Sequence, residues 1–386
     1  MDFSHVLTDT YTLLLLIVLT LALVGLSLYY GLFYLRVGRY KNKKLPQPGD
    51  VPPEDLPGIS VVLTTHNEGA FLRETLLYLL EQDYPNFEVV VVNYTSTDDT
   101  EFVLKCLADN YSNLKVIPFP KDVNIFTGKK LPLSIGIKSA KHDLLLLTEP
   151  DACPKCKNED DFKWIRHMVT GFLKGADIVM GHCGVRQDVG LLNGLMQYDN
   201  LDNAASMFGW AILGNPYTAT GRNLGYRRSF FFNRGGFIQH YQVREGADDM
   251  FVNQNANKKN TAMVISPEAY MTTDPRSTFG QWHQLRYARY ATKKFYSPKD
   301  KMLLLLRPLM VVLFYLSGIL LALRGTFPWP ILLGILVLDW VWQIICFAQI
   351  TKRFERKVVH AFAPVYEIYF LFANTILYFS ALFKKK

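Results

Sequence analysis

Asp248 and Asp249 are adjacent carboxylates in the stretch Glu245–Met250, within a polar segment that lies between apolar runs. A basic and aromatic stretch, Gln281–Lys294, follows them. A positioned carboxylate can act as a general base, taking the proton of a hydroxyl as that hydroxyl attacks. The pair therefore predicts that a hydroxyl is activated beside a lipid surface.

Three further acidic places each follow a run that we expect to form a strand: Asn67-Glu68, Thr95–Asp99 and Glu149-Pro150-Asp151. Carboxylates in such loops are ordinarily solvated, but the carboxyl ends of parallel strands meet at one edge of a sheet. Glu149 and Asp151 offer the oxygen ligands that Mg²⁺ and Mn²⁺ prefer, and these ions bridge phosphates.

The elements that must hold these residues alternate along the chain. Short β-branched and apolar runs predict buried strands, and apolar residues at helical spacing predict helices. This alternation predicts an α/β domain with a mostly parallel sheet. No Gly-x-Gly-x-x-Gly follows the first strand, which argues against a dehydrogenase. The sequence also contains no Walker loop, which argues against a phosphoryl transferase. The predicted strands are Ile59–Thr64, Phe87–Val92, Leu114–Ile117 and Leu144–Leu147; the predicted helices are Ala70–Gln82, Thr97–Asn110 (capped by Ser96, Thr97 or Asp98) and Lys130–Ala140.

Apolar runs flank this domain. Tyr11–Leu35 carries no charge and exceeds the roughly 20 residues that cross a bilayer as a helix. The residues that precede this run include Asp2 and Asp9 but no Lys or Arg, which favours an uncleaved anchor over a cleaved signal peptide. Two later runs also predict membrane spans, Met302–Leu323 and Trp329–Ile350.

A fourth apolar run, Val358–Phe383, is interrupted by Pro364, Glu367 and Asn374. It spans the membrane, re-enters it or lies on its surface. A carboxylate at membrane depth ordinarily faces protein or water, so we expect Glu367 to do so.

Basic residues predict the orientation. The clusters within Arg36–Lys44 and Lys352–Lys357 lie on the cytoplasmic side if Met1 is outside. Lys384–Lys386 would then lie outside if the fourth run spans once, against the same rule.

The formal charge of +8 is largely juxtamembrane, which suits anionic lipid and not nucleic acid. Five cysteines fit a reducing compartment; the Cys153/Cys156 pair has no second pair to make a zinc site, and a redox role is left open.

The order of these segments resembles a membrane-bound family 2 glycosyltransferase with a GT-A fold. The resemblance runs from about Ile59 to the end of the chain, and no single motif carries it. The matching stretches are Thr64–Glu68, Gln82–Glu88, Ser96–Thr100, Gly128–Lys130, Thr148–Pro154, Gly221–Arg227, Asp248-Asp249 and Gln281–Lys294.

The resemblance implies a donor site for a nucleotide-activated sugar. Its first loop places His66, Asn67 and Glu68 by the nucleotide, and Lys130 joins them. Tyr94 stands where the family usually has an Asp that reads the nucleoside. Glu149-Pro150-Asp151 stands in place of Asp-x-Asp, which implies Mg²⁺ or Mn²⁺ on Glu149 and Asp151.

The resemblance also implies the catalytic groups. Asp249 matches the general base, with Asp248 as its acidic neighbour. The family's Gln-x-x-Arg-Trp motif is here Arg286-Tyr-Ala-Arg289-Tyr290. Arg286, Arg289, Tyr290 and Arg222 are thereby expected to hold the diphosphate or the acceptor. Tyr198, Asp199 and Asp202, on a predicted helix, either line the acceptor channel or form a wet face.

We therefore expect an inner-membrane enzyme that transfers a sugar, with inversion and metal assistance, to a lipid-linked or glycan acceptor. With so few spans, single addition is favoured over processive synthesis. The changes at Tyr94 and Glu149 also allow a different class, a non-catalytic membrane protein that scaffolds a partner. The expected organisation is an anchor (1–36), a basic Pro-rich linker (37–57), a cytoplasmic GT-A domain (58–275), an interfacial helix (276–300) and a membrane region (301–386).

Overall fold

The computed structural model describes residues 9–42, 45–119, 128–154, 162–356 and 359–383. The chain divides into two compact units. The membrane-helix unit contains Met1–Tyr40, Leu201–Gly209 and Ser297–Lys386, and the sheet unit contains Lys41–Asn200 and Trp210–Tyr296.

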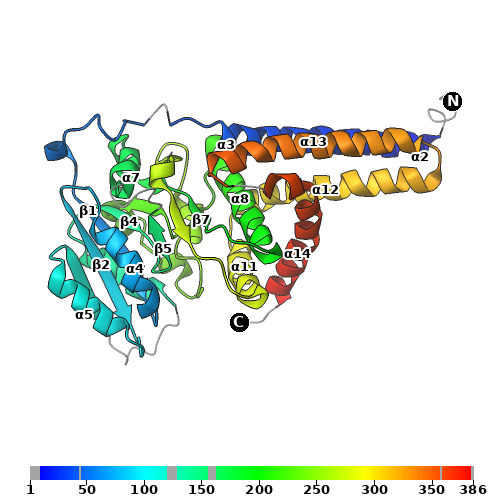
Figure 1. Ribbon diagram of the computed structural model, residues 1–386. Coiled ribbons are helices and arrows are strands. Elements are labelled where there is room, and N and C mark those ends of the chain that lie inside the picture. Colours follow the sequence, from blue (N-terminus) through cyan, green and yellow to red (C-terminus); the bar gives the residue numbers. More distant parts are fainter. Residues whose placement is uncertain (1–8, 43–44, 120–127, 155–161, 357–358, 384–386) are drawn as a thin grey trace. The chain divides into compact units, whose positions relative to one another are not determined.

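A seven-stranded sheet forms the centre of the sheet unit (Figure 1). Its order is β3-β2-β1-β4-β8-β6-β9. All neighbours are parallel except that β8 runs antiparallel to both β4 and β6. This arrangement confirms the mostly parallel sheet that the sequence predicts. The strands are β1 (Ile59–Thr65), β2 (Phe87–Tyr94), β3 (Leu114–Phe119), β4 (Leu144–Leu147), β6 (Ile178–Met180), β8 (Leu224–Arg227) and β9 (Thr261–Met263).

A second, three-stranded sheet was not predicted. Its order is β5 (Ala152–Pro154), β10 (Met271–Thr273) and β7 (Cys183–Val185). Strands of three residues are too short to show periodicity in a sequence. The pairing matters for the site, because it aligns Thr273 with Ala152 and so brings the segment after β10 to the turn after β4.

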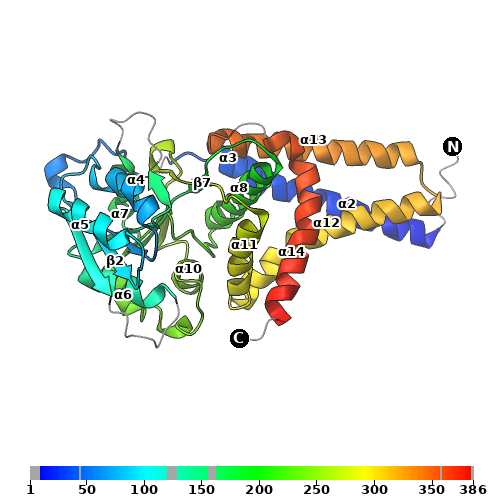
Figure 2. The same cartoon turned by 60° about the horizontal axis from the view of Figure 1, so that its bottom comes forward.

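Both faces of the large sheet are covered by helices. Figure 2 shows α6 (Lys130–Ser139) on one side and α4 (Gly69–Leu80), α5 (Thr100–Asn110) and α7 (Trp164–Leu173) on the other. Parallel strands buried on both faces read as continuous apolar runs, as in Phe87–Tyr94. A side chain at Gly136 of α6 would lie 2.8 Å from Val62 and 3.0 Å from Val92, so the glycine permits this close packing.

The start of α5 differs from the predicted start at Thr97. Asn67 holds the preceding loop, accepting a hydrogen bond from the Thr97 amide at 2.7 Å. Asp98 then accepts from the Thr100 amide at 3.0 Å, and the helix begins there. Further helices of the sheet unit are α9 (Arg228–Asn233), α10 (Asp249–Asn255) and α11 (Phe279–Lys293), with 3₁₀ turns at Pro53–Asp55, Ile238–His240 and Pro267–Ala269.

The membrane-helix unit holds four helices that are long and apolar enough to cross a membrane, among the residues described. They span Thr10–Gly38, Pro298–Arg324, Trp329–Arg353 and His360–Ala381. The first combines α2 (Thr10–Tyr29), a π-helical turn (Tyr30–Leu35) and α3 (Arg36–Gly38); the others contain α12 (Pro298–Arg324), α13 (Trp329–Arg353), and a 3₁₀ turn (Val359–Phe362) with α14 (Ala363–Phe383).

Arg307 of α12 organises the polar interior of this unit. It contacts Glu367 of α14 at 2.7 Å and also donates to Asp202, which lies on α8 (Leu191–Ile212). Tyr30 donates to Glu367 at 2.7 Å, and Tyr34 donates to Asp202 at 2.6 Å. Glu367 therefore faces protein, as expected. These contacts also explain why Leu201–Gly209 groups with the membrane helices, which the predicted organisation does not include.

Candidate active site

The loops after β1 and β2 have unusual backbone conformations and are joined by a hydrogen bond. Asn67 and Thr95 both have a φ of 56°, a left-handed conformation that non-glycine residues rarely adopt. The Asn67 amide donates to the Ser96 hydroxyl at 3.0 Å. Strained backbone of this kind is concentrated at functional sites.

His66 and Tyr94 stack on each other between these two loops. Their ring centroids lie 5.2 Å apart with planes 22° from parallel. Next to them, a cavity of about 370 Å³ lies at the carboxyl ends of β2 and β3. Residues that line it include Asn93, Thr95 and Phe119.

Glu68 turns back into its own loop. Its carboxylate accepts from the Thr65 hydroxyl at 3.2 Å and from the His66 amide at 3.3 Å. Burial raises the pKa of Glu68, and the charges of Asp151 and Glu149 add to the rise. The first loop and the turn after β4 therefore lie within electrostatic reach of each other.

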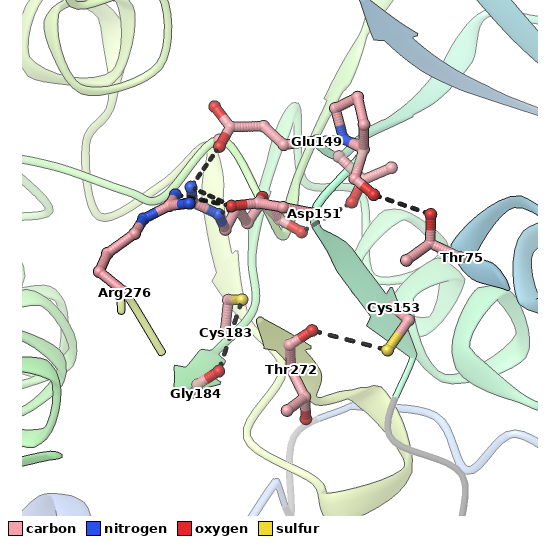
Figure 3. A network of polar contacts seen from close by, with 12 residues as sticks. Thr75, Glu149, Asp151, Cys153, Cys183, Gly184, Thr272 and Arg276 are labelled. Atoms are coloured by element: carbon pink, nitrogen blue, oxygen red, sulfur yellow. Dashed lines mark hydrogen bonds and ion pairs between the residues drawn. The ribbon is translucent and has the colours of Figure 1, made fainter. Parts of the chain in front are cut away.

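Glu149 and Asp151 form ion pairs with three basic side chains. Arg222 contacts Glu149 Oε2 through Nη2 at 2.9 Å and Asp151 Oδ1 through Nε at 2.9 Å. Arg276 contacts Asp151 Oδ2 at 2.8 Å, and Lys129 donates to Glu149 Oε1. In Figure 3 the side chains of Glu149, Asp151 and Arg276 converge. We call these five residues the Glu149 cluster.

Elements far apart in the sequence position this cluster. Arg222 precedes β8, which pairs with β4, and its carbonyl accepts from the Thr148 hydroxyl at 3.2 Å. Arg276 follows β10. From α4, Thr75 donates to the Pro150 carbonyl at 2.7 Å and holds the turn from the opposite side (Figure 3).

Glu149 and Lys129 keep their charges at neutral pH. Burial acts to raise the pKa of Glu149, but Arg222 and Lys129 outweigh it and lower that pKa to about 2. Burial likewise opposes the charge on Lys129, yet Glu149 and Asp248 raise the pKa of its amine. Three cations and two carboxylates leave one net positive charge.

Glu149 and Asp151, the predicted metal ligands, do not form a vacant ligand set. Each of their four oxygens contacts Lys129, Arg222 or Arg276. Among the described residues, no group of three or more His, Cys, Asp or Glu side chains could hold a metal ion. Cys156, which forms the CxxC spacing with Cys153, lies outside the described residues. As arranged, the cluster does not fit a divalent ion unless a basic side chain leaves.

Asp248 and Asp249 have different surroundings. Asp248 accepts from the Gly221 amide at 2.5 Å and lines a small cavity with Lys129 and Glu149. Asp249 begins α10 and is only 8% exposed.

Both oxygens of Asp249 accept hydrogen bonds. Its Oδ1 accepts from the Met250 amide at 2.8 Å, and its Oδ2 accepts from the Tyr296 hydroxyl at 2.7 Å and from Thr292. Burial, aided by the charge of Asp248, raises the pKa of Asp249 to about 6. The carboxylate can therefore take up a proton near neutral pH.

Arg286 and Arg289 meet at a different carboxylate from Arg222. Both contact Asp199, at 3.3 Å and 3.2 Å. Arg286 is 1% exposed, and its guanidinium lies 5.0 Å from the centre of the Trp282 ring. The amine of Lys293 lies 3.9 Å from the centre of the Tyr290 ring. The predicted clamp therefore divides, with Arg222 in the Glu149 cluster and the other two arginines anchored by Asp199.

Lys130, predicted to contact the donor, has its amine directed into the protein. It is buried, and its amine donates to the carbonyls of His240 at 2.8 Å and Val243 at 2.7 Å. Burial lowers its pKa to about 8. Because α6 begins at Lys130, this side chain turns inward while Lys129, at the cap position, reaches Glu149. The sequence analysis did not single out Arg276, Thr292 or Tyr296. Lys129 lies in the matching stretch Gly128–Lys130 and Thr292 in the matching stretch Gln281–Lys294, so these two stretches carried a signal.

Residues 60–235 match the family model "Glycosyl transferase family 2", and the chain therefore contains a family 2 glycosyltransferase domain. It is 25% identical over 233 residues to the probable glycosyltransferase YdaM of Bacillus subtilis (strain 168), covering 57% of this chain and 53% of that protein. It is 28% identical over 125 residues to poly-beta-1,6-N-acetyl-D-glucosamine synthase of Staphylococcus aureus (strain COL), covering 32% of this chain and 28% of that one. The chain thus spans about half or less of these curated relatives.

The fold also has a solved counterpart. The mannosyltransferase PcManGT from Pyrobaculum calidifontis, in complex with GDP-Man and Mn²⁺, aligns with a TM-score of 0.57 and 20% identity, over 96% of this chain and 99% of that one. The likeness is one of fold, and it establishes the GT-A architecture that the sequence predicts.

Proposed function

We propose that this protein is a membrane-bound glycosyltransferase that moves a sugar from a nucleotide-sugar donor to a lipid-linked or glycan acceptor. One observation carries the proposal. Lys129 donates to Glu149 and lines the same small cavity as Asp248, so a positive group suited to a diphosphate lies next to the acidic pair. The family 2 domain over residues 60–235 supports this assignment.

The chemistry is a single displacement. The acceptor oxygen attacks the anomeric carbon and forms the new glycosidic bond, while the bond from that carbon to the diphosphate oxygen breaks and the nucleoside diphosphate leaves with the electron pair. Asp249 takes the acceptor proton. A base with a pKa of about 6 is largely ionised at neutral pH and still able to accept the proton. Attack opposite the leaving group inverts the anomeric centre.

The leaving diphosphate develops negative charge, which positive groups placed in advance stabilise. The sequence predicts Mg²⁺ or Mn²⁺ for this purpose, and the mannosyltransferase from Pyrobaculum calidifontis is in complex with Mn²⁺. The basic members of the Glu149 cluster are a second source of positive charge. Either source is compatible with sugar transfer.

The stacked rings of His66 and Tyr94 suit a nucleoside. Aromatic faces bind flat rings by stacking, and the neighbouring cavity of about 370 Å³ offers space at the same sheet edge. This arrangement supports donor binding even though Tyr94 stands where an acidic residue is usual.

The acceptor is expected at a membrane. Four candidate spans and the basic stretch after the first of them support an inner-membrane protein whose sheet unit is cytoplasmic. Residues 276–300, with Phe279, Arg289 and Tyr290 exposed or partly exposed, have the composition of an interfacial helix that contacts lipid headgroups, whereas Trp282 is buried. We favour single addition over processive synthesis.

The full chain in lipid nanodiscs tests the proposal. It is incubated with a panel of nucleotide sugars and membrane lipid extract, with Mn²⁺ or with EDTA, and released nucleoside diphosphate is measured. We expect release with at least one donor, and its loss in Asp249→Asn. Loss in Asp248→Asn alone, with Asp249→Asn active, would move the base to Asp248.

The alternative is a scaffold without catalysis, motivated by the replacements at Tyr94 and Glu149. It predicts that no donor binds in either condition and that a stable partner co-purifies with the chain. Donor-dependent release of nucleoside diphosphate excludes it.

A further inference from the structure

The carboxylates that would bind a metal are already neutralised by protein. One carboxylate oxygen of Glu149 accepts a hydrogen bond from Lys129, and the other forms an ion pair with Arg222. Oδ1 of Asp151 accepts a hydrogen bond from Arg222 at 2.9 Å. Its Oδ2 accepts one from Arg222 at 3.0 Å and one from Arg276 at 2.8 Å. A divalent ion needs carboxylate oxygens that are not committed to other cations.

The charge balance also opposes a divalent ion. The cluster carries three positive and two negative side chains. A divalent ion that approached the oxygens of Glu149 and Asp151 would meet Lys129, Arg222 or Arg276 at each of them, where like charges repel. An anion meets the opposite situation.

The three basic side chains remain within reach of a ligand. Their exposed fractions are 28% for Lys129, 17% for Arg222 and 31% for Arg276. Arg222 uses Nε and Nη2 for the carboxylates, and within the described part of the chain these contacts leave its Nη1 to meet an anion. A guanidinium can form paired hydrogen bonds with phosphate oxygens, and an ammonium adds a point charge.

We propose that Lys129, Arg222 and Arg276 bind the diphosphate of the donor directly, without a divalent ion. Glu149 and Asp151 then hold the basic side chains in place and do not act as metal ligands. The longer side chain at position 149 lets one carboxylate join Lys129 to Arg222. This inference rests on the proposed function, because it assumes a nucleotide-sugar donor.

Equilibrium binding of UDP and GDP to the purified full chain tests the inference. Affinity is measured by calorimetry with excess EDTA and with Mn²⁺. We expect the tighter nucleotide to bind with affinities that agree within about twofold in the two conditions. An affinity more than about tenfold higher with Mn²⁺ would overturn the inference.

Variants identify the groups responsible. Lys129→Met is expected to weaken binding in EDTA at least about tenfold, because a charge-assisted contact to phosphate is lost. Lys129→Arg keeps the charge and is expected to retain most of the affinity. Lys174→Met, an exposed lysine at the end of α7, is the matched control and is expected to bind as the unmodified chain does. Unchanged binding in folded Lys129→Met would contradict the proposal; thermal unfolding checks that each variant is folded.

Mn²⁺ binding is read separately by electron paramagnetic resonance of the free ion. Without nucleotide, we expect the unmodified chain to take up no stoichiometric Mn²⁺. Uptake that Glu149→Gln abolishes would assign the metal to the cluster and overturn the inference.

The outcomes separate the two proposals. Nucleotide binding that requires Mn²⁺ overturns metal-free binding and leaves the glycosyltransferase proposal standing. No binding of any nucleoside diphosphate in either condition overturns both. Metal-independent binding that depends on Lys129 supports both.

Discussion

The hydroxyl of Tyr296 donates a 2.7 Å hydrogen bond to Oδ2 of Asp249. The bond joins the start of α10 to the segment just after α11, and Thr292 of α11 donates to the same oxygen. Because both donors favour the ionised carboxylate, they oppose the effects of burial and of Asp248 on its pKa. Two segments of the sheet unit thus set the proton affinity of the proposed base together.

Tyr296→Phe is expected to shift the pH dependence of transfer. The substitution removes a bond that lowers the pKa of Asp249, so the pKa rises and less base is ionised at a given pH. The acid limb of the rate profile should move upward by about 0.5 to 1 pH unit. Lys130 and Asp248 also influence this carboxylate and are unchanged.

Initial rates from pH 5 to pH 9 measure this shift. Tyr78→Phe, on the exposed side of α4, serves as control and should leave the limb in place. An unmoved limb in folded Tyr296→Phe would show that Asp249 does not set it.

Asp249→Asn is expected to stabilise the fold as it abolishes transfer. The folded-state pKa of about 6 lies above the ordinary value of 3.8. The folded form therefore holds its proton more tightly than the unfolded form, and stability is lost as pH rises through about 6. The shift corresponds to about 3 kcal/mol, which the neutral Asn does not lose.

Thermal unfolding midpoints in detergent at pH 5 and pH 8 check this expectation. The advantage of Asp249→Asn over the unmodified chain should grow with pH. Asp109→Asn, exposed on α5, should show no such trend. An advantage that shrinks toward pH 8 would contradict the assigned pKa.

Gly221→Ala is expected to impair transfer without unfolding the protein. A Cβ at this position would lie 2.9 Å from Oδ2 of Asp248, so the carboxylate must move. Misplacement of a site group by about 1 Å can cost up to about a hundredfold in rate. The matched control is Gly280→Ala, whose Cβ would meet nothing within 4 Å. Equal kcat values for the two variants would argue that the position of Asp248 is unimportant.

Arg307→Met is expected to destabilise the membrane-helix unit. The substitution leaves Glu367 as a buried carboxylate and Asp202 as a partly buried one, both without their cation. Breaking a buried pair in this way typically costs about 3 to 5 kcal/mol. The thermal midpoint of the full chain should fall, and adding Asp202→Asn and Glu367→Gln should restore much of it. No recovery in the triple variant would indicate that Arg307 acts through packing alone.

The sequence predicted the elements that local patterns encode. All four predicted strands are present, and β4 keeps its predicted bounds of Leu144–Leu147. Helix ends moved by a few residues, as at Thr100, where hydrogen bonds from the neighbouring loop decide the start. The three-residue strands β5, β7 and β10 were not predicted, because they are defined by their pairing and not by a periodic pattern in the sequence.

The candidate site was predictable only in part. Motif order placed Asp248, Asp249, Glu149 and Asp151 in functional stretches. It did not distinguish Lys129 from Lys130, because the direction of each side chain depends on where α6 begins. It also joined Arg222 to Arg286, whereas the ion-pair partner of Arg286 is Asp199.

By itself the sequence determined the α/β domain, the apolar helices and the family resemblance, because hydrophobic spacing and motif order are local properties of the chain. Only the tertiary structure decided which charges meet. Glu149 reaches Arg222, and Asp249 reaches Tyr296, across many intervening residues. Such pairings depend on strand order and helix packing, which no local pattern specifies. The sequence therefore presents Glu149 and Asp151 as metal ligands, and only the tertiary structure brings basic side chains to their oxygens.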